Sequence, residues 1–303
     1  MTDSDQLSSD ILRLKRERKA LLLVHNYQRP EIQDLADVLG DSLELSRKAV
    51  EAKASLIVFC GVKFMAETAK ILLPDSTVLL PRLDAGCPMA DMVDPDTLHE
   101  MRRRYPDAAV VTYVNSPAEV KAESDICVTS ANAAAIVQKL DARKILFLPD
   151  RNLASYVQRF TDKQVIPWPG FCYVHECFTR EEVLDARKKH TDAVLVVHPE
   201  CRPEIVDLAD AVRSTSGMLK FVRTSSAAEF LIGTEEGLLY RMKKENPEKA
   251  FYSIGSVKTC VNMKKTRLED LHRALLENRH EIVLPADIMV RARAALDKML
   301  LYA

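Results

Sequence analysis

The sequence predicts an α/β protein made of three homologous α/β/α units with short parallel sheets, in a pseudo-three-fold arrangement around a central active site. Short apolar runs that end in polar residues alternate with helical patterns, which is typical of parallel α/β proteins. The same pattern recurs along the chain at two fixed steps, of 88 and 85 residues. A chain of 303 residues is also longer than a single hydrophobic core usually supports.

Three sets of equivalent positions carry the repeat. Each set has one member per unit, and its members are separated by the same two steps. The sets are His25, Tyr113 and His198, where an apolar run reaches a polar residue; Ser42, Ser130 and Thr215, where a helical pattern opens; and Ile57, Ile145 and Phe230, in the next apolar run. One continuous doubly wound sheet is the alternative, and three matched sets count against it.

The repeat also sets the expected domain boundaries. The first α/β unit should cover residues 1–92, the second 93–178 and the third 179–265. The tail, residues 266–303, reads as a helix, a short strand and a final helix. We expect this tail to complete the first unit.

Composition excludes several classes of partner. The 43 Lys and Arg residues nearly balance the 44 Asp and Glu residues, so no nucleic-acid or membrane-surface partner is indicated. The first 30 residues lack the apolar stretch of a signal peptide, which favours a cytoplasmic protein. In that reducing compartment, seven cysteines are expected to bind metal, catalyse or pack in a core rather than form disulfides. No GxGxxG, Walker or CxxC motif is present.

The cysteines follow the repeat. Cys87 and Cys260 are separated by 173 residues, which is the sum of the two steps. Their counterpart in the middle unit is His175, and Cys172 lies three residues earlier in the same predicted loop. Each unit therefore offers one cysteine after its last strand, and the three loops can converge near the pseudo-axis. Cys60 and Cys127 are expected to be buried core residues, whereas the roles of Cys177 and Cys201 stay open.

Three thiolates without a fourth favour an open metal site. They could hold zinc with one free coordination position, or a [4Fe-4S] cluster with one iron free of cysteine. The absence of paired cysteines favours the cluster. Clusters that only transfer electrons usually have four cysteines, so a three-cysteine site suggests an iron that acts as a Lewis acid on a substrate oxygen.

Several motifs together resemble the quinolinate synthase family. They include "HNYQ", "GDS", "GCPMA", "YVNS", "TSANA", "PDRNLA", "GFCYVHE", "HPEC", "STSGM" and "GTEEG", and the resemblance runs from about residue 21 to the end. It implies three α/β/α domains, a [4Fe-4S] cluster held by one cysteine per domain, and condensation of iminoaspartate with dihydroxyacetone phosphate into quinolinate, the precursor of NAD. It also suggests functional coupling to L-aspartate oxidase. One departure is Arg213, where the family more often has glycine.

The expected substrates carry a phosphate and two carboxylates, which need fixed hydrogen-bond donors. Ser42, Ser130 and Thr215 each sit where a predicted strand gives way to a helix, and a helix N-terminus binds anions well. The alternative is that all three are ordinary N-caps. Their equivalence in three inward-facing loops favours anion binding. Asp150, in "LPDRN", is explained as a helix cap.

The reaction also requires proton transfers to and from carbon and oxygen. Polar residues two apart follow the first strand of each unit, so the two can share a face. These pairs are His25 and Tyr27, Tyr113 and Asn115, and His198 and Glu200. We expect Glu200 to be the base, and Tyr27 and Tyr113 to be proton donors or positioners. The remaining assignments are substrate-oxygen contacts for His25, His175 and His198 and a carboxylate contact for Asn115.

Two other functions remain as alternatives. A non-enzymatic iron-sulfur sensor would use the repeats only as a scaffold, and the row of polar residues expected around the pocket counts against it. Another hydro-lyase with an open iron would use similar chemistry, but the order of the motifs and the three-unit repeat count against it.

Overall fold

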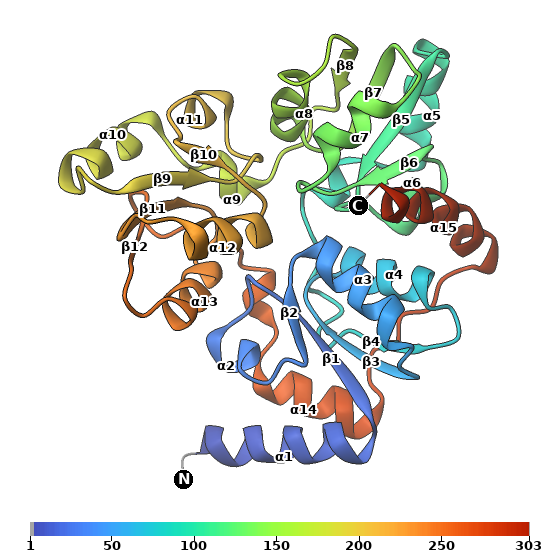
Figure 1. Cartoon of the computed structure of the whole chain (residues 1–303). Coiled ribbons are helices and arrows are strands. Elements are labelled where there is room, and N and C mark those ends of the chain that lie inside the picture. Colours follow the sequence, from blue (N-terminus) through green and yellow to red (C-terminus); the bar gives the residue numbers. More distant parts are fainter. Residues whose placement is uncertain (1–2, 303) are drawn as a thin grey trace.

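The computed structural model describes residues 3–302 and contains three separate four-stranded parallel sheets. Figure 1 shows the first unit in blue, the second in green and the third in yellow to orange, each with its own sheet and helices. Each sheet has the strand order second, first, third, fourth along the chain of its unit. The predicted fold class is therefore confirmed, and the alternative of one continuous sheet is wrong.

The elements follow the same order in each unit. The first unit contains α1 (Asp3–Glu17), β1 (Ala20–His25), α2 (Pro30–Gln33), β2 (Val38–Gly40), α3 (Ser42–Ala52), β3 (Leu56–Cys60), α4 (Lys63–Leu72), β4 (Thr77–Leu79) and η1 (Ala90–Met92). The second contains α5 (Pro95–Arg104), β5 (Ala108–Tyr113), α6 (Ala118–Ala122), β6 (Ile126–Val128), α7 (Ala133–Lys139), β7 (Lys144–Leu148), α8 (Arg151–Gln158), β8 (Gln164–Pro167) and α9 (Tyr173–Glu176).

The third unit and the tail complete the chain. The third contains α10 (Arg180–Lys189), β9 (Val194–Val197), α11 (Pro203–Val206), β10 (Ala211–Val212), α12 (Thr215–Thr224), β11 (Glu229–Gly233), α13 (Gly237–Glu245), β12 (Ala250–Ser253) and η2 (Met263–Lys265), and the tail contains α14 (Leu268–Glu277) and α15 (Ala286–Leu301). None of the helices in residues 3–302 combines the length and apolar character needed to cross a bilayer.

The central strands keep the spacing of the sequence repeat. Strands β3, β7 and β11 each have five residues, and both their first and last residues are separated by the steps of 88 and 85. They are almost wholly buried because helices cover both faces of each sheet. After the charged first residues of β7 and β11, Lys144 and Glu229, these strands have no polar side chain, which explains why the repeat is visible as continuous apolar runs.

The strand order directs each unit's polar residues to one place. In all three sheets the first strand lies between the second and the third. The chain therefore moves to one side of the first strand to form the second, and then crosses to its other side to form the third. In open α/β sheets, this switch point leaves a crevice beyond the carboxyl ends of the strands. The first strands, β1, β5 and β9, are the strands that lead into the predicted polar pairs.

The tail is divided between two units. Helix α14 packs against α1 and β3 of the first unit, and Glu281 forms an isolated antiparallel bridge with Leu79 where a short strand was expected. Helix α15 instead packs mainly against α6 and β6 of the second unit, as its position in Figure 1 also shows. The short α6, only five residues long, leaves apolar surface that α15 covers.

We propose that only the first half of the tail, residues 266–284, completes the first unit, residues 1–92. Helix α15 would belong with the second unit, residues 93–178. Its buried side chains share one hydrophobic core with Ile126 and Ile136 of that unit. The third unit would keep residues 179–265.

A substitution in α15 tests this division. Leu296 is fully buried, so Leu296→Ala should lower the free energy of unfolding by about 2–5 kcal/mol through a cavity in the second unit's core. Amide hydrogen exchange should then rise in α6 and β6. Val290 is 72% exposed on the same helix, and Val290→Ala should change stability by less than about 0.5 kcal/mol. Faster exchange confined to β1 and β3 would contradict the assignment.

Candidate active site

One cavity between the three units is lined by every site residue that the sequence predicts. The structure brings together His25, Tyr27, Ser42, Cys87, Tyr113, Asn115, Ser130, Cys172, His175, His198, Glu200, Thr215 and Cys260. Each unit contributes the end of its first strand, one helix start and one cysteine. The proximity that the repeat predicted is therefore present, whereas the chemical roles of these residues remain predictions.

The first and third units present equivalent histidines. His25 ends β1, and its Nδ1 accepts a hydrogen bond from the backbone N–H of Tyr27 at 3.2 Å. His198 follows β9, and its Nδ1 accepts from the backbone N–H of Glu200 at 3.3 Å. Burial lowers the pKa of His25 to about 4 and that of His198 to about 3, so both are neutral near pH 7. Because Nδ1 is the acceptor in each, Nε2–H is the group left to donate a hydrogen bond.

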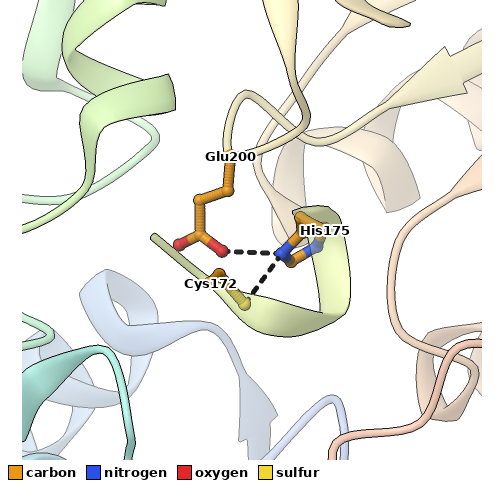
Figure 2. A group of neighbouring side chains, drawn as sticks. All are labelled: Cys172, His175 and Glu200. Atoms are coloured by element: carbon orange, nitrogen blue, oxygen red, sulfur yellow. Dashed lines mark hydrogen bonds and ion pairs between the residues drawn. The ribbon is translucent and has the colours of Figure 1, made fainter. Parts of the chain in front are cut away.

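Glu200 is a buried carboxylate with several partners. Its Oε2 lies 2.7 Å from Nδ1 of His175 and 3.7 Å from Nδ1 of His198, and Tyr113 donates a hydrogen bond to the carboxylate. Burial opposes the charge of Glu200, but His198, His175 and the hydrogen bond from Tyr113 outweigh it and lower the pKa to about 2. Glu200 is therefore a charged base within a largely apolar enclosure. Figure 2 shows its contact with His175.

The two tyrosines stay protonated. Burial is the main cause that raises the pKa of both Tyr27 and Tyr113 well above 10, and the charge of Glu200 adds to it. Tyr113 also exchanges a hydrogen bond with Ser130. Each phenol can thus donate a hydrogen bond or a proton in the cavity.

The helix caps are not the predicted hydroxyls. Asp41 caps α3 by accepting from the N–H groups of Leu43 and Glu44 at 3.1 and 3.0 Å. Ser214 caps α12 by accepting from the N–H of Gly217 at 3.3 Å. Ser42 and Thr215 are the first helical residues, so their hydroxyls are not engaged in capping. The explanation that both are ordinary N-caps is wrong, because the preceding residue already has the better capping geometry.

The second unit differs at the same position. Helix α7 begins three residues after Ser130, and its N-cap is Asn132, whose Oδ1 accepts from the N–H of Thr129 at 2.7 Å. In the same unit, the buried Oδ1 of Asn115 has no hydrogen-bond partner among residues 3–302. An orphaned buried oxygen is costly unless a ligand or water satisfies it, which suits a residue that contacts substrate.

In all three cysteine loops, backbone N–H groups face the cysteine sulfur. Cys87 and Cys260 each lie three residues before a 3₁₀ turn, and Cys172 directly precedes α9. Backbone N–H groups donate hydrogen bonds to each sulfur. The donors are Met89 and Ala90 for Cys87, Asn262 and Met263 for Cys260, and His175 for Cys172. Burial raises the pKa of all three thiols, and each of them except Cys260 is raised further by a neighbouring cysteine. Hydrogen bonds of this kind favour thiolates that bind a metal.

A second donor group overlaps the cysteines. Sγ of Cys172, a ring nitrogen of His175 and a carboxylate oxygen of Glu200 lie within 4.8 Å of one another. Figure 2 shows the three side chains pointing toward one another. Both nitrogens of His175 are already engaged, since Nδ1 contacts Glu200 at 2.7 Å and Cys172 at 3.2 Å, and Nε2 contacts Thr234 at 3.0 Å. The site is thus compatible with a metal cofactor, with the cysteines as its free donors.

The remaining cysteines and Arg213 lie outside this arrangement. Cys60 and Cys127 are fully buried, as expected for core residues. Cys201 is also buried, and its thiol contacts the carbonyl of Gly233 at 3.5 Å, whereas Cys177 is exposed. Arg213 is exposed and donates to its neighbouring carbonyl, that of Val212, so its side chain does not line the cavity.

Sequence reasoning missed several supporting residues. Asp41 precedes the predicted Ser42, and its place before a helical pattern was the available signal. Asp150 caps α8 as expected, but its second oxygen also accepts from the N–H of Cys172 at 3.1 Å. Thr234 gave no signal, because the equivalent positions in the other units are Gly61 and Pro149.

Comparisons with known proteins show the family to which the chain belongs. The family model described as "Quinolinate synthetase A protein" matches residues 9–301. Relatives named quinolinate synthase include one from Methanoregula boonei, 54% identical over 99% of both chains, and one from Thermodesulfovibrio yellowstonii, 55% identical over 96% of both chains. Another, from Methanosarcina barkeri, is 50% identical over 97% of both chains. Because the family model matches residues 9–301 and relatives named quinolinate synthase match nearly the whole length, the chain belongs to the quinolinate synthetase A family, NadA.

Proposed function

We propose that this protein condenses iminoaspartate with dihydroxyacetone phosphate to form quinolinate, with release of phosphate and water, in NAD biosynthesis. We place it in the cytoplasm, where L-aspartate oxidase would be functionally coupled to it as the source of iminoaspartate. The observation that carries the proposal is the meeting of three thiols, one charged carboxylate and several neutral proton donors in a single cavity between the units. Membership of the family supports the same activity.

Cys87, Cys172 and Cys260 would hold a [4Fe-4S] cluster. The fit rests on the donor set: one thiol comes from each unit, and backbone N–H groups point at each sulfur. Their raised pKa values mean that the free thiols are protonated, so metal binding would displace the protons. When bound, such a cluster would supply a Lewis-acidic iron without a cysteine ligand, which polarises a substrate oxygen.

The anionic ends of the substrates would bind at the helix starts. The hydroxyls of Ser42 and Thr215 are free of capping, and each lies at the positive end of a helix of at least ten residues. Ser130 would add a third hydroxyl from the second unit. Asn115 would use its amide group on a carboxylate, and a bound water or substrate donor would satisfy its orphaned Oδ1.

Glu200 would remove protons from carbon. Its charge is maintained at neutral pH, and Tyr113 and His175 hold its oxygens in place. Tyr27 and Tyr113 would donate protons or position the substrate. His25 and His198 would present Nε2–H to substrate oxygens as neutral donors, and His175 would orient Glu200 beside them.

The direct test of activity uses the loaded protein under anaerobic conditions. After reconstitution with iron and sulfide, incubation with dihydroxyacetone phosphate and freshly generated iminoaspartate should yield quinolinate, measured by chromatography. Glu200→Gln should retain its iron and lose product formation, because the amide cannot act as a base. Absence of quinolinate from wild-type protein with a full complement of iron would reject the proposal and favour a non-enzymatic iron-sulfur sensor.

The cysteine assignment predicts a pattern of iron loss. Separate Cys87→Ser, Cys172→Ser and Cys260→Ser variants should each lose most of their iron and sulfide after anaerobic reconstitution, because a serine hydroxyl is a poor substitute for a thiolate ligand of iron. Cys177→Ser is the matched control, since Cys177 is exposed in the same loop, and it should keep wild-type iron content. Full iron content in Cys172→Ser would show that the assignment is wrong.

Substitutions at the starts of α3 and α12 distinguish a hydroxyl that binds substrate from one that caps a helix. Ser42→Ala should raise KM by about tenfold or more through a lost hydrogen bond to an anion, with little change in thermal stability. Ser214→Ala should instead cost about 0.5–2 kcal/mol of stability, because Ser214 caps α12. Enzyme kinetics and urea unfolding measure the two effects. A loss of stability without a change in KM for Ser42→Ala would show that its hydroxyl is structural.

A further inference from the structure

Lys121 is a charged residue in the interior of the protein, and the proposed mechanism does not use it. It lies in α6, is fully buried, and is not among the residues that line the central cavity. Burial lowers the pKa of its ammonium group, and the charge of Glu67 acts in the opposite direction. A lysine is almost never fully buried unless other groups satisfy its ammonium. The groups that satisfy it here therefore indicate its role.

The ammonium group of Lys121 joins two units through backbone carbonyls. Its Nζ donates to the carbonyl of Ser116 in the second unit at 2.7 Å and to that of Phe64, in α4 of the first unit, at 3.4 Å. In the opposite direction, the buried carboxylate of Glu67 in α4 accepts the N–H of Ala118 at 3.2 Å. These contacts fix the start of α6 and the turn before it against the first unit.

The carbonyl that Lys121 binds belongs to the residue next to Asn115. Ser116 is itself fully buried, and its hydroxyl donates to the carbonyl of Tyr113 at 3.0 Å. Tyr113 and Asn115 both line the cavity, and Oδ1 of Asn115 has no partner among residues 3–302. Because no group in that part of the chain holds this oxygen, the backbone of the turn sets where it lies.

The first unit has the same arrangement at the equivalent position. Gln33 lies 88 residues before Lys121, at the end of α2, and it is also buried. Its Nε2 donates to the carbonyl of Gln28 at 2.8 Å and to that of Gly237 in the third unit at 2.9 Å. By the steps of the repeat, these are the equivalents of the two carbonyls that Lys121 binds. The two side chains thus share the hydrogen-bond donor and not the positive charge.

We propose that Lys121 is a positioning residue that fixes the turn after β5, so that Asn115 meets the carboxylate of iminoaspartate. This inference rests on the proposed function, which gives Asn115 that contact. Lys121 lies behind the turn, acts through the carbonyl of Ser116 and does not touch the substrate. Dihydroxyacetone phosphate has no carboxylate, so its binding does not depend on this contact.

The test compares Lys121→Met with Lys121→Gln in the iron-loaded protein, with quinolinate formation as the readout. Iminoaspartate is generated from a series of oxaloacetate concentrations with excess ammonia. Methionine has no donor for the Ser116 carbonyl, so the apparent KM for iminoaspartate should rise by about tenfold or more, with that for dihydroxyacetone phosphate within about threefold of wild type. Glutamine keeps the donor that serves in the first unit, so both KM values should stay within about threefold of wild type.

Leu275→Ala is the control for a general loss of stability. Leu275 is fully buried in α14, in a core cluster of the first unit that does not include the turn after β5. Its truncation should lower the midpoint of urea unfolding and leave both KM values within about twofold of wild type. The control thus separates displacement of the turn from loss of folded protein.

The two KM values of the methionine variant decide the proposal. An unchanged KM for iminoaspartate, or equal increases for both substrates, would overturn the positioning role while the proposed function stands. If the methionine variant does not fold, the glutamine variant decides: values near those of wild type would support the role, and a rise of about tenfold in its KM for iminoaspartate would overturn it. A wild-type protein that forms no quinolinate would overturn both the role and the proposed function.

Discussion

The buried negative charge of Glu200 is the constraint around which the three units close. A carboxylate with 3% exposure is tolerated only where other groups satisfy it, since an unpaired buried charge costs several kcal/mol. Here His175 and Tyr113 come from the second unit, while Glu200 itself belongs to the third. His198 of the third unit also lowers the pKa of Glu200, but the contacts with His175 and Tyr113 form only when the second and third units meet. The cavity lies between the same units, so their assembly both encloses Glu200 and brings His175 and Tyr113 to its carboxylate.

A second buried pair ties the cysteine loop to the first unit. Glu235 is fully buried and lies 3.0 Å from Nζ of Lys264, and its carboxylate also accepts the N–H of Cys260 at 2.9 Å. Lys264 in turn donates to the backbone carbonyl of Tyr27 at 2.6 Å. A single ion pair thus sets the position of one proposed iron ligand relative to the strand end that carries Tyr27. Metal binding and substrate positioning share this support, although the residues are far apart in sequence.

Much of the fold was readable from the sequence, and the reason lies in the parallel sheets. Strands covered on both faces are mostly apolar, so the repeated runs align, and the polar residue at or after the end of each first strand marks the carboxyl edge where ligands bind. The repeat therefore predicted correctly that His25, Tyr113 and His198 lie at one cavity. It failed where the units differ. Thr234 has no equivalent, and the antiparallel bridge of Glu281 is too short to leave an alternating pattern. The repeat did not predict that Asp41 and Ser214 cap α3 and α12, because its matching positions are Ser42 and Thr215, one residue later.

The path of the tail has a consequence for how the protein is made. The second unit is synthesised early, but α15, which covers α6 and β6, emerges from the ribosome only after the whole third unit. Until then, Ile126 of β6 lacks the helix that covers it, and the nascent chain presents an apolar face to solvent or to a chaperone. The second unit can therefore complete its hydrophobic core only after the third unit has been translated. The central cavity reaches its final form late in translation, after every cysteine of the chain has already been translated.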